Sequence, residues 1–355
     1  MMNDFGGFNM DITTYTMILV VKNWSLGWAY RDGGMKDSDL TDGQIERKVV
    51  DFPNIFEYST YVFSSAGCCV GPFFEYYDFK NWIEMTGHYK DAPRGLASGW
   101  ASLGPAIIKT LQGFLWLGLH IGFVLGGGFS VYYCGTKEFV NYKTFLHRVG
   151  YYYAAMTGQR FMYYTPWALT DAAVISSGLG YNGRKDGSYL WDRIYSILVI
   201  ELETSATPIK SMSYWNHMIS VWLNNYVQQR LLKKGERPGL MVTGCTFAVS
   251  AFWHGFYPFY YFMFFMCAIF VETAKDIYRM RIFFDFIPAP YGHIIANICQ
   301  FLVLNYLGIT FNALTFERGN NFGKATYYYI YILLPVLCFT IKALGLVKKA
   351  KKLED

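Results

Sequence analysis

Charged residues are scarce in this 355-residue sequence. Only 16% of its residues are charged, whereas soluble domains carry roughly a quarter. Hydrophobic residues make up 53% of the chain. The net charge of +5 is small for this length and gives no sign of a nucleic-acid-binding surface. The shortage of charge therefore argues against a chain built from soluble domains.

Several patterns of soluble enzymes are also missing. The sequence has no GxSxG serine elbow and no P-loop. "GLGYNG" at 178–183 has the spacing of GxGxxG, but no buried strand of a βαβ unit accompanies it, so we reject a dinucleotide site. The cysteines form no Cys-x-x-Cys pair and no Cys/His ligand spacing, so no metal site is expected. They are Cys68, Cys69, Cys134, Cys245, Cys267, Cys299 and Cys338.

What the sequence does contain is long apolar blocks. Uncharged runs occur at 110–135, 239–271, 294–316 and 325–341, and weaker candidates at 12–30, 55–74 and 158–180. A helix needs about 20 apolar residues to cross a bilayer. Helices satisfy their own backbone hydrogen bonds in lipid. We therefore predict an all-α, polytopic integral membrane protein with roughly six to eight transmembrane helices.

Two further stretches predict helices at the interface or in the interior of the protein. The stretch 144–168 mixes His147, Arg148 and Arg160 with many tyrosines, which favour sites that are apolar at one end and wet at the other. In 213–231, aromatic residues recur at helical spacing, and amides rather than charges occupy the other positions. Such a helix could lie at the interface or face an internal polar cavity.

His254 is the first candidate for chemistry. It stands in "SAFWHGFYP" (250–258), and it is the only histidine or charged residue between Arg237 and Glu272. A polar group at membrane depth is costly and is a functional-site hypothesis by default. Burial disfavours the charged imidazole, and a neutral imidazole can act as a general base. The alternative is a histidine hydrogen-bonded between helices. Gly255 and Pro258 are expected to break the helix just after it.

Asn216 is the second candidate, because an asparagine amide can orient a substrate or donate to a developing oxyanion. Its alternative role is an N-terminal helix cap. His120 is another histidine inside an apolar run, with an interhelical hydrogen bond as its alternative role. The basic loop from Arg230 to Arg237 could meet the phosphates of lipids or of coenzyme A, or could simply be a positive cytosolic loop.

The stretches "YWNHMISVWLNNYVQQR" (214–230) and "SAFWHGFYPFYY" (250–261) resemble the signature of the membrane-bound O-acyltransferase family. Within that family the chain is similar to the lysophospholipid acyltransferase branch. Three further stretches agree, in the expected order: "MDITTYTMILVVK" (10–22), "VGPFFEYYDF" (70–79) and "SSGLGYNGR…WDR" (176–193). The resemblance covers most of the chain.

The resemblance implies a multi-pass enzyme of the endoplasmic reticulum membrane, with helices around an internal catalytic chamber. It would transfer an acyl group from acyl-CoA, as substrate and without a cofactor, to the free hydroxyl of a lysophospholipid. The family's catalytic histidine carries over onto His254 and its catalytic asparagine onto Asn216. The remaining site prediction is a set of substrate contacts, and it comprises Trp215, Trp222, Tyr226, Arg230, Trp253 and His120. A homo-oligomer is compatible with this resemblance.

Three alternatives stay open at this point. The acceptor could be another molecule, such as glycerol-3-phosphate, a sterol, diacylglycerol or a protein. The chain could be a transporter that uses His120 and His254 as a relay, although it shows no paired halves. It could also be inactive, because the family branch normally has several spans before the "MDIT" stretch and only nine residues precede it here. We therefore expect one domain, 1–355, that lacks the family's N-terminal spans.

Overall fold

The computed structural model describes residues 12–67, 70–94, 96–233, 235–284 and 286–348, which are mainly helical. Its helices are α1 (Ile12–Gly33), α2 (Asp42–Arg47), α3 (Ile55–Val62), α4 (Tyr76–Glu84), α5 (Leu96–Ile121), α6 (Lys137–Val140), α7 (Phe145–Ser176), α8 (Val199–Thr204), α9 (Pro208–Tyr214), α10 (His217–Leu223), α11 (Leu240–His254), α12 (Pro258–Arg279), α13 (Ala289–Ala313), α14 (Phe316–Ala325) and α15 (Tyr329–Ala343). The predicted all-α class is confirmed.

The remaining regular structure is short. An antiparallel pair joins β1 (Arg184–Lys185) to β2 (Ser188–Tyr189). Two π-helical turns continue longer helices, and they span Gly122–Gly126 and Asn224–Gln228. Single 3₁₀ turns span Asp37–Asp39, Gly87–Tyr89, Tyr133–Gly135, Gln229–Leu231 and Arg281–Phe284.

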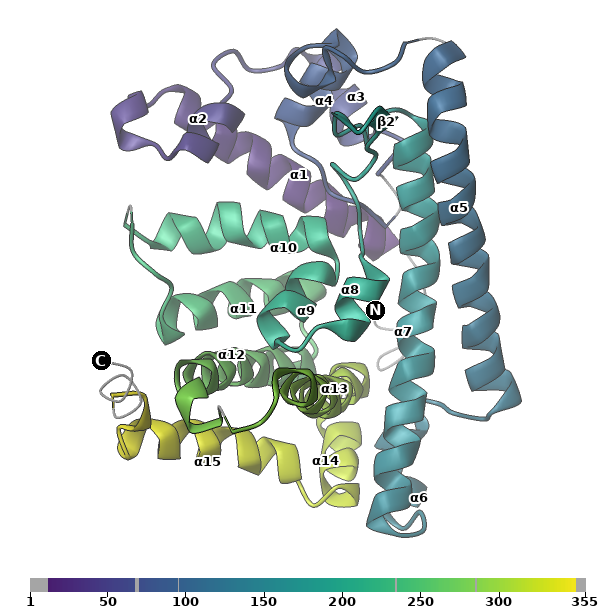
Figure 1. Ribbon diagram of the computed structural model, residues 1–355, viewed down its shortest axis with the longest axis vertical. Helices are drawn as coiled ribbons and strands as arrows, with labels where there is room; N and C mark the ends of the chain where they lie inside the picture. Colours follow the sequence, from purple (N-terminus) through teal and green to yellow (C-terminus); the bar gives the residue numbers. More distant parts are fainter. Residues whose placement is uncertain (1–11, 68–69, 95, 234, 285, 349–355) are drawn as a thin grey trace.

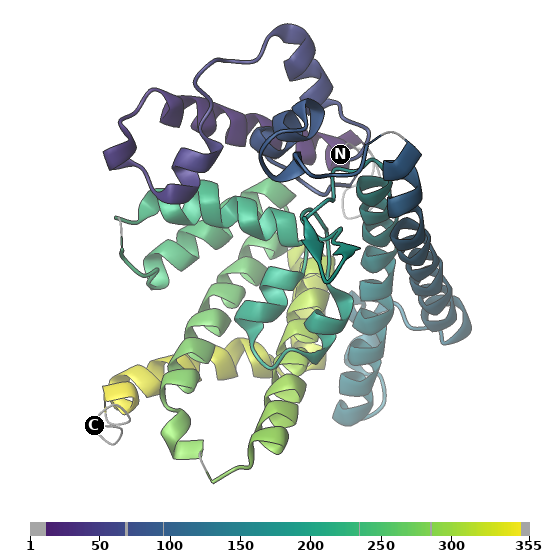
Figure 2. The ribbon, with the colours of Figure 1, turned by 45° about the horizontal axis from the view of Figure 1, so that its top comes forward.

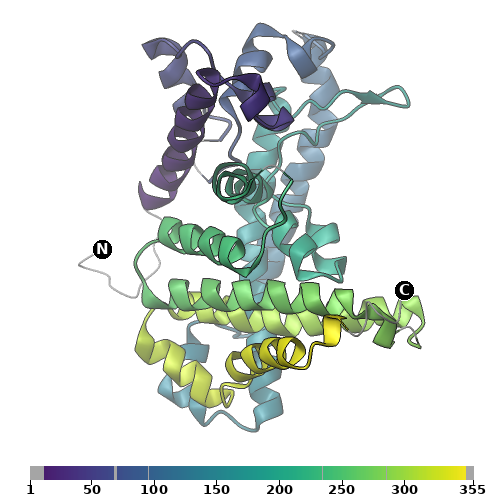
Figure 3. The same cartoon turned by 90° about the vertical axis from the view of Figure 1, so that its left-hand side faces the viewer.

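The helices fall into two groups. The long helices α5 and α7 pack along each other at one edge of the molecule (Figures 1 and 2). Beside them, α1, α10, α11, α12 and α15 are stacked across the view of Figure 1. Figure 3 shows α12 and α13 side by side, with α15 below them. As a result, α11 lies between the elements of the N-terminal third and the C-terminal helices.

Few helices meet the length and composition of a membrane span. Among the described residues, Gly99–Gly126 and Ala289–Ala313 do so, and the bent pair α14–α15 would be a third if it acts as one span. The predicted number of six to eight spans is therefore not confirmed. The Gly99–Gly126 helix has only 6% of its most apolar window buried. An apolar helix so exposed is suited to contact with lipid.

The break predicted after His254 is present. α11 ends at His254, and α12 begins at Pro258, whose missing N–H costs nothing at the first position of a helix. Gly255 has a φ of 121°, a conformation that residues with a side chain rarely adopt. The apolar run 239–271 therefore forms two helices, and His254 lies at the corner between them.

The stretch 144–168, predicted as an interfacial or interior helix, is the first part of α7 and carries buried charge. Arg148 and Arg160 are only 6% and 7% exposed. Arg160 donates to the Glu203 carboxylate at 2.9 Å and also hydrogen-bonds Asn305. Glu203 lies in α8 and Asn305 lies in α13. This cluster therefore joins α7, α8 and α13 around one guanidinium.

Lys22 is a charged side chain inside the apolar run 12–30, and the neighbouring sequence offers it no obvious partner. It is 0% exposed, and its Nζ donates to the carbonyls of Tyr61 at 2.9 Å and Val62 at 3.4 Å. The same Nζ lies 4.2 Å from the centre of the Phe74 ring. A cation at the last carbonyls of a helix satisfies groups that have no partner inside the helix. Lys22 therefore caps α3 from α1.

Glu75 is a second buried charge of this region. Its Oε2 accepts a hydrogen bond from the Tyr226 hydroxyl at 2.6 Å, and its Oε1 lies 3.8 Å from Nε of Arg47. Burial raises the pKa of Glu75 to about 7, while Arg47, Tyr226 and Asn225 oppose the shift and Asp78 adds to it. The carboxyl group therefore titrates near neutral pH.

Replacing Lys22 by methionine should destabilise the protein. Lys22→Met keeps the length of the side chain but removes the buried ammonium that donates to the two α3 carbonyls, which should lower the free energy of unfolding by about 1–3 kcal/mol. The measurement is the thermal unfolding midpoint of the detergent-solubilised protein, with the exposed Lys36→Met as the matched control. An equal midpoint for both variants would contradict the capping role.

Glu75 should make stability depend on pH. Its pKa in the folded protein lies above the usual value of 4.5, so the protonated carboxyl is favoured by folding. The resulting stabilisation is complete below about pH 4.5 and is lost as the pH rises through about 7, and it is on the order of 3 kcal/mol. In Glu75→Gln, the unfolding midpoint should change less between about pH 5 and pH 8. Identical pH profiles for the two proteins would exclude this role.

Candidate functional site

His254 is surrounded by aromatic rings. Its imidazole stacks on Phe264 at a centroid distance of 5.3 Å and meets Phe311 edge-on at 5.0 Å. Tyr260 lies at 5.8 Å and the neighbouring Trp253 at 4.9 Å. The side chain is half-buried. The sequence predicted His254 but not Phe264 and Phe311, whose only signal is their position in the neighbouring apolar runs.

The imidazole of His254 has no hydrogen-bond partner among the described residues. Within the described residues, His254 therefore does not form the interhelical hydrogen bond that was its alternative role. Trp253 is instead the residue that makes the helix-to-helix bond, because its Nε1 donates to the carbonyl of Met17 in α1 at 3.0 Å. A half-buried imidazole without a partner can exchange a proton with a bound molecule.

Asn216 has an unusual backbone conformation. It lies between α9 and α10 with φ 45° and ψ 57°, in the left-handed region. It occupies the N-cap position of α10, but its side chain makes no capping bond and has no other hydrogen-bond partner among the described residues. A non-glycine residue held in this region costs free energy, and such residues cluster at active sites. The capping alternative thus explains the position of Asn216 but not its free amide.

Contacts of His217 hold Asn216 in this conformation. The N–H of His217 donates to the Ser196 carbonyl at 2.7 Å, and its ring nitrogen Nδ1 donates to the Ser213 carbonyl at 2.8 Å. The ring also stacks on Tyr195, with centroids 4.3 Å apart. Burial lowers the pKa of His217, so the ring is neutral at neutral pH. Ser196 is fixed in turn, because its N–H donates to the buried Asp171 carboxylate at 2.6 Å.

Both predicted catalytic residues have aromatic neighbours. Trp215, next to Asn216, packs its ring edge-on against Tyr163 of α7, with centroids 5.5 Å apart. Tyr260 lies beside His254, with centroids 5.8 Å apart. In the described part of the chain, no hydrogen bond joins the side chains of Asn216 and His254.

Three hydrophobic clusters border on His254 and Asn216. One core contains residues of α1, α3, α4 and α10, with Trp253 packed against it. A second contains residues of α7 and α11–α15, including Ala251. A third, smaller cluster includes Tyr164 and Trp167, with Trp215 packed against it. Residues adjacent to His254 and Asn216 thus belong to all three clusters.

His120 lies elsewhere and has a structural role. Its Nδ1 is 2.9 Å from the carbonyl oxygen of Gly158, so the imidazole donates from α5 to α7. This is the interhelical bond expected as its alternative role. Gly158 allows the close approach, because a Cβ at this position would lie 2.8 Å from the side chain of Phe123. The substrate contact predicted for His120 stays a prediction.

Trp222, Tyr226 and Arg230 belong to the N-terminal core rather than to the surroundings of His254. Trp222 is 2% exposed, and Tyr226 is bonded to Glu75. Arg230 donates to both oxygens of Asp32, at 2.7 and 2.6 Å. Its charge is therefore compensated inside the protein. Substrate contacts by these three residues remain predictions.

Two cavities lie apart from His254 and Asn216. One, of about 290 Å³, is lined by residues of α4 and of the loops around 92–94 and 178–191. The other, of about 600 Å³, is lined by residues of α12, α14 and α15. His254 and Asn216 line neither of them. The sequence did not predict these cavities, because each combines segments that are distant along the chain.

The described residues contain no group of three or more His, Cys, Asp or Glu side chains that could hold a metal ion. The cysteines at 134, 245, 267, 299 and 338 are free, and Cys68 and Cys69 lie outside the described residues. The groups present around His254 are an imidazole and aromatic rings, which suits proton transfer to or from an organic substrate.

The sequence is similar to proteins named acyltransferases. The sequence pattern described as "MBOAT, membrane-bound O-acyltransferase family" matches residues 3–312. A protein of Schizosaccharomyces pombe named lysophospholipid acyltransferase is 33% identical, over 93% of this chain and 67% of its own length. Lysophospholipid acyltransferase 2 of Arabidopsis thaliana is 28% identical, over 96% of this chain and 74% of its own.

A third relative matches this chain over a smaller share of its own length. Lysophospholipid acyltransferase 6 of Drosophila melanogaster is 28% identical, over 96% of this chain but 48% of its own length. The family match extends through every element from α1 to α12 and almost to the end of α13. It includes both His254 and Asn216. The chain therefore belongs to the membrane-bound O-acyltransferase family.

Proposed function

We propose that this protein transfers a fatty acyl group from acyl-CoA to the free hydroxyl of a lysophospholipid, in the membrane of the endoplasmic reticulum. The observation that carries the proposal is the similarity, over more than nine-tenths of the chain, to relatives named lysophospholipid acyltransferases. The half-buried imidazole of His254, which has no partner among the described residues, supplies a group able to do the chemistry.

In the proposed reaction, His254 takes the proton of the lysophospholipid hydroxyl as its oxygen attacks the thioester carbonyl. A carbon–oxygen bond forms, the carbon–sulfur bond breaks, and the CoA thiolate leaves and takes a proton from the imidazolium. The thioester is already activated, so no covalent enzyme intermediate is needed. Correct positioning and stabilisation of the oxyanion then account for most of the required rate enhancement.

Asn216 supplies the second proposed role. Its amide has no hydrogen-bond partner among the described residues, so it can donate to the oxyanion or hold a reacting group. The backbone around it is fixed by His217 and Ser196 before any substrate binds. A donor that is already oriented needs no reorganisation during the reaction.

The basic loop after Arg230 is proposed to lie near the phosphates of CoA. Arg230 itself is paired with Asp32, which leaves Lys233 and Arg237 as exposed cations in the described part of the loop; Lys234 lies outside the described residues. Both are accessible to a phosphate in solution. The head group of the acceptor, the acylated position and the acyl chain would be identified by an activity panel of acyl-CoAs against lysophospholipids.

His254→Ala should abolish acyl transfer. Loss of general-base catalysis lowers a rate by about 100- to 10,000-fold. The measurement is incorporation of a labelled acyl group into phospholipid, in membranes that lack other acyltransferases. His88→Ala is the matched control, because His88 is exposed and paired with Glu46 at 3.3 Å. Wild-type activity of His254→Ala would exclude the proposed base.

Asn216→Gly separates the amide from the backbone conformation. Glycine accepts the left-handed region without strain, so the fold should be kept while the amide is lost. If the amide donates to the oxyanion, the rate should fall by about 100- to 1,000-fold. The comparison is acyl transfer beside the thermal unfolding midpoint. An active, stable Asn216→Gly protein would leave Asn216 with a structural role alone.

A further inference from the structure

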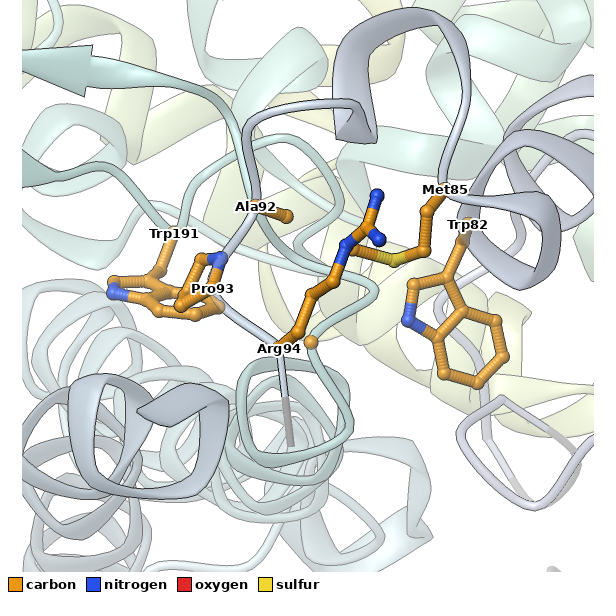
Figure 4. A pocket seen from close by; sticks show the side chains of 7 residues that line it. Trp82, Met85, Ala92, Pro93, Arg94 and Trp191 are labelled. Atoms are coloured by element: carbon orange, nitrogen blue, oxygen red, sulfur yellow. The ribbon is translucent and has the colours of Figure 1, made fainter. Parts of the chain in front are cut away.

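The smaller cavity has one charged residue and otherwise apolar walls. Its lining comes from the end of α4, from the loop before α5 and from the loop that carries the β1–β2 pair, and it comprises Trp82, Met85, Ala92, Pro93, Arg94, Gly178 and Trp191. Figure 4 shows Pro93 beside Trp191 on one side, Met85 and Trp82 on the other, and the Arg94 side chain extending between them. Its volume is about 290 Å³.

Arg94 is available to a ligand. Among the described residues, no ion pair or hydrogen bond engages its guanidinium. Several other arginines of the fold are paired with carboxylates, as Arg193 is with Asp78 at 2.8 and 2.5 Å. A guanidinium presents donors in a planar fork that matches the oxygens of a phosphate. Two indole rings and a thioether beside it favour an apolar group attached to that phosphate.

The walls of this cavity are held in place by hydrogen bonds between the segments that form it. The Tyr89 hydroxyl donates to the Leu179 carbonyl at 2.8 Å, and the Tyr181 hydroxyl donates to the Asp91 carbonyl at 3.3 Å. The Tyr181 ring also packs edge-on against Trp191 at 5.9 Å. The loop before α5 and the loop of the β1–β2 pair are thus fixed to each other, which makes the cavity pre-formed.

The position of the cavity points to the membrane interface. Arg94 lies five residues before Gly99, where the span-length apolar helix Gly99–Gly126 begins. Trp100, in the first turn of this helix, is 75% exposed, and Ile83, which follows the lining residue Trp82 in the chain, is 57% exposed. Tryptophan and arginine at the end of an apolar span are typical of the headgroup level of a bilayer. Lipid phosphates are concentrated at that depth.

We propose that this cavity binds a glycerophospholipid of the surrounding bilayer through its phosphate group. Arg94 pairs with the phosphate oxygens, while Trp82, Met85 and Trp191 contact the glycerol and the first carbons of the acyl chains. His254 does not line the cavity, so this lipid is bound apart from the proposed reaction. The site therefore holds the α4–α5 corner of the protein to the headgroup layer.

The test uses a photo-crosslinking residue inside the cavity. Met85 is replaced by p-benzoylphenylalanine in the His254→Ala protein, so that the result does not depend on acyl transfer. The protein is placed in phosphatidylcholine vesicles that contain either phosphatidic acid or diacylglycerol with the same labelled chains. We expect cross-links to phosphatidic acid, and weak ones to diacylglycerol, which has no phosphate.

Arg94→Gln should reduce the yield of this cross-link about tenfold, the loss that corresponds to one charge-assisted hydrogen bond. Arg94→Lys should retain most of it. Arg31→Gln, a change of an exposed arginine outside the cavity, is the matched control and should leave the yield unchanged. The unfolding midpoints of these variants show whether the fold is kept.

Four outcomes would overturn the proposal. Equal labelling by diacylglycerol would show that the phosphate is not recognised. An unchanged yield in Arg94→Gln would show that Arg94 does not bind the lipid. Displacement of the lipid by inorganic phosphate or free CoA would identify the site with a soluble anion. A cross-link to another protein in native membranes, in place of lipid, would identify a protein contact. None of these outcomes bears on whether His254 is catalytic.

Discussion

A polar group that is removed from water must find its partner inside the protein, and this constraint organises the whole chain. Lys22 finds the last carbonyls of α3, Arg160 finds Glu203 and Asn305, and Arg230 finds Asp32. In each case the partner lies in a different helix or loop. These polar pairings fix the relative positions of helices whose apolar surfaces alone would not specify one register.

His254 and Asn216 stand out against this pattern. Their side chains have no hydrogen-bond partner among the described residues, although their neighbours Trp253 and His217 are tightly bonded. The structure thus holds the backbone of each residue firmly and leaves the functional group free. Rigid support around an unsatisfied group is the arrangement that pre-organised catalysis requires.

Local patterns in the sequence predicted more than distant pairings did. The break at Gly255–Pro258, helical structure in 213–231 and the buried part of α7 all depend on neighbouring residues, and all three are present. The stretch 213–231 is nevertheless not one helix, because the left-handed backbone at Asn216 separates α9 from α10. The bond between Arg230 and Asp32 joins residues 198 positions apart, so no local pattern could reveal it. The number of spans was not confirmed, because apolar runs also form helices that pack against protein, as α11 does. The cavity around Arg94 was missed because three separate segments line it.

The left-handed backbone at Asn216 has a consequence for how this position can change over evolutionary time. Asparagine, aspartate and glycine adopt that region at a lower cost than other residues, and the β-branched residues adopt it least readily. Of the residues that fit the backbone, only asparagine brings a neutral amide. Backbone conformation and proposed chemistry therefore both favour asparagine at position 216. At position 254, where the backbone is helical, the proposed chemistry alone restricts the choice of side chain.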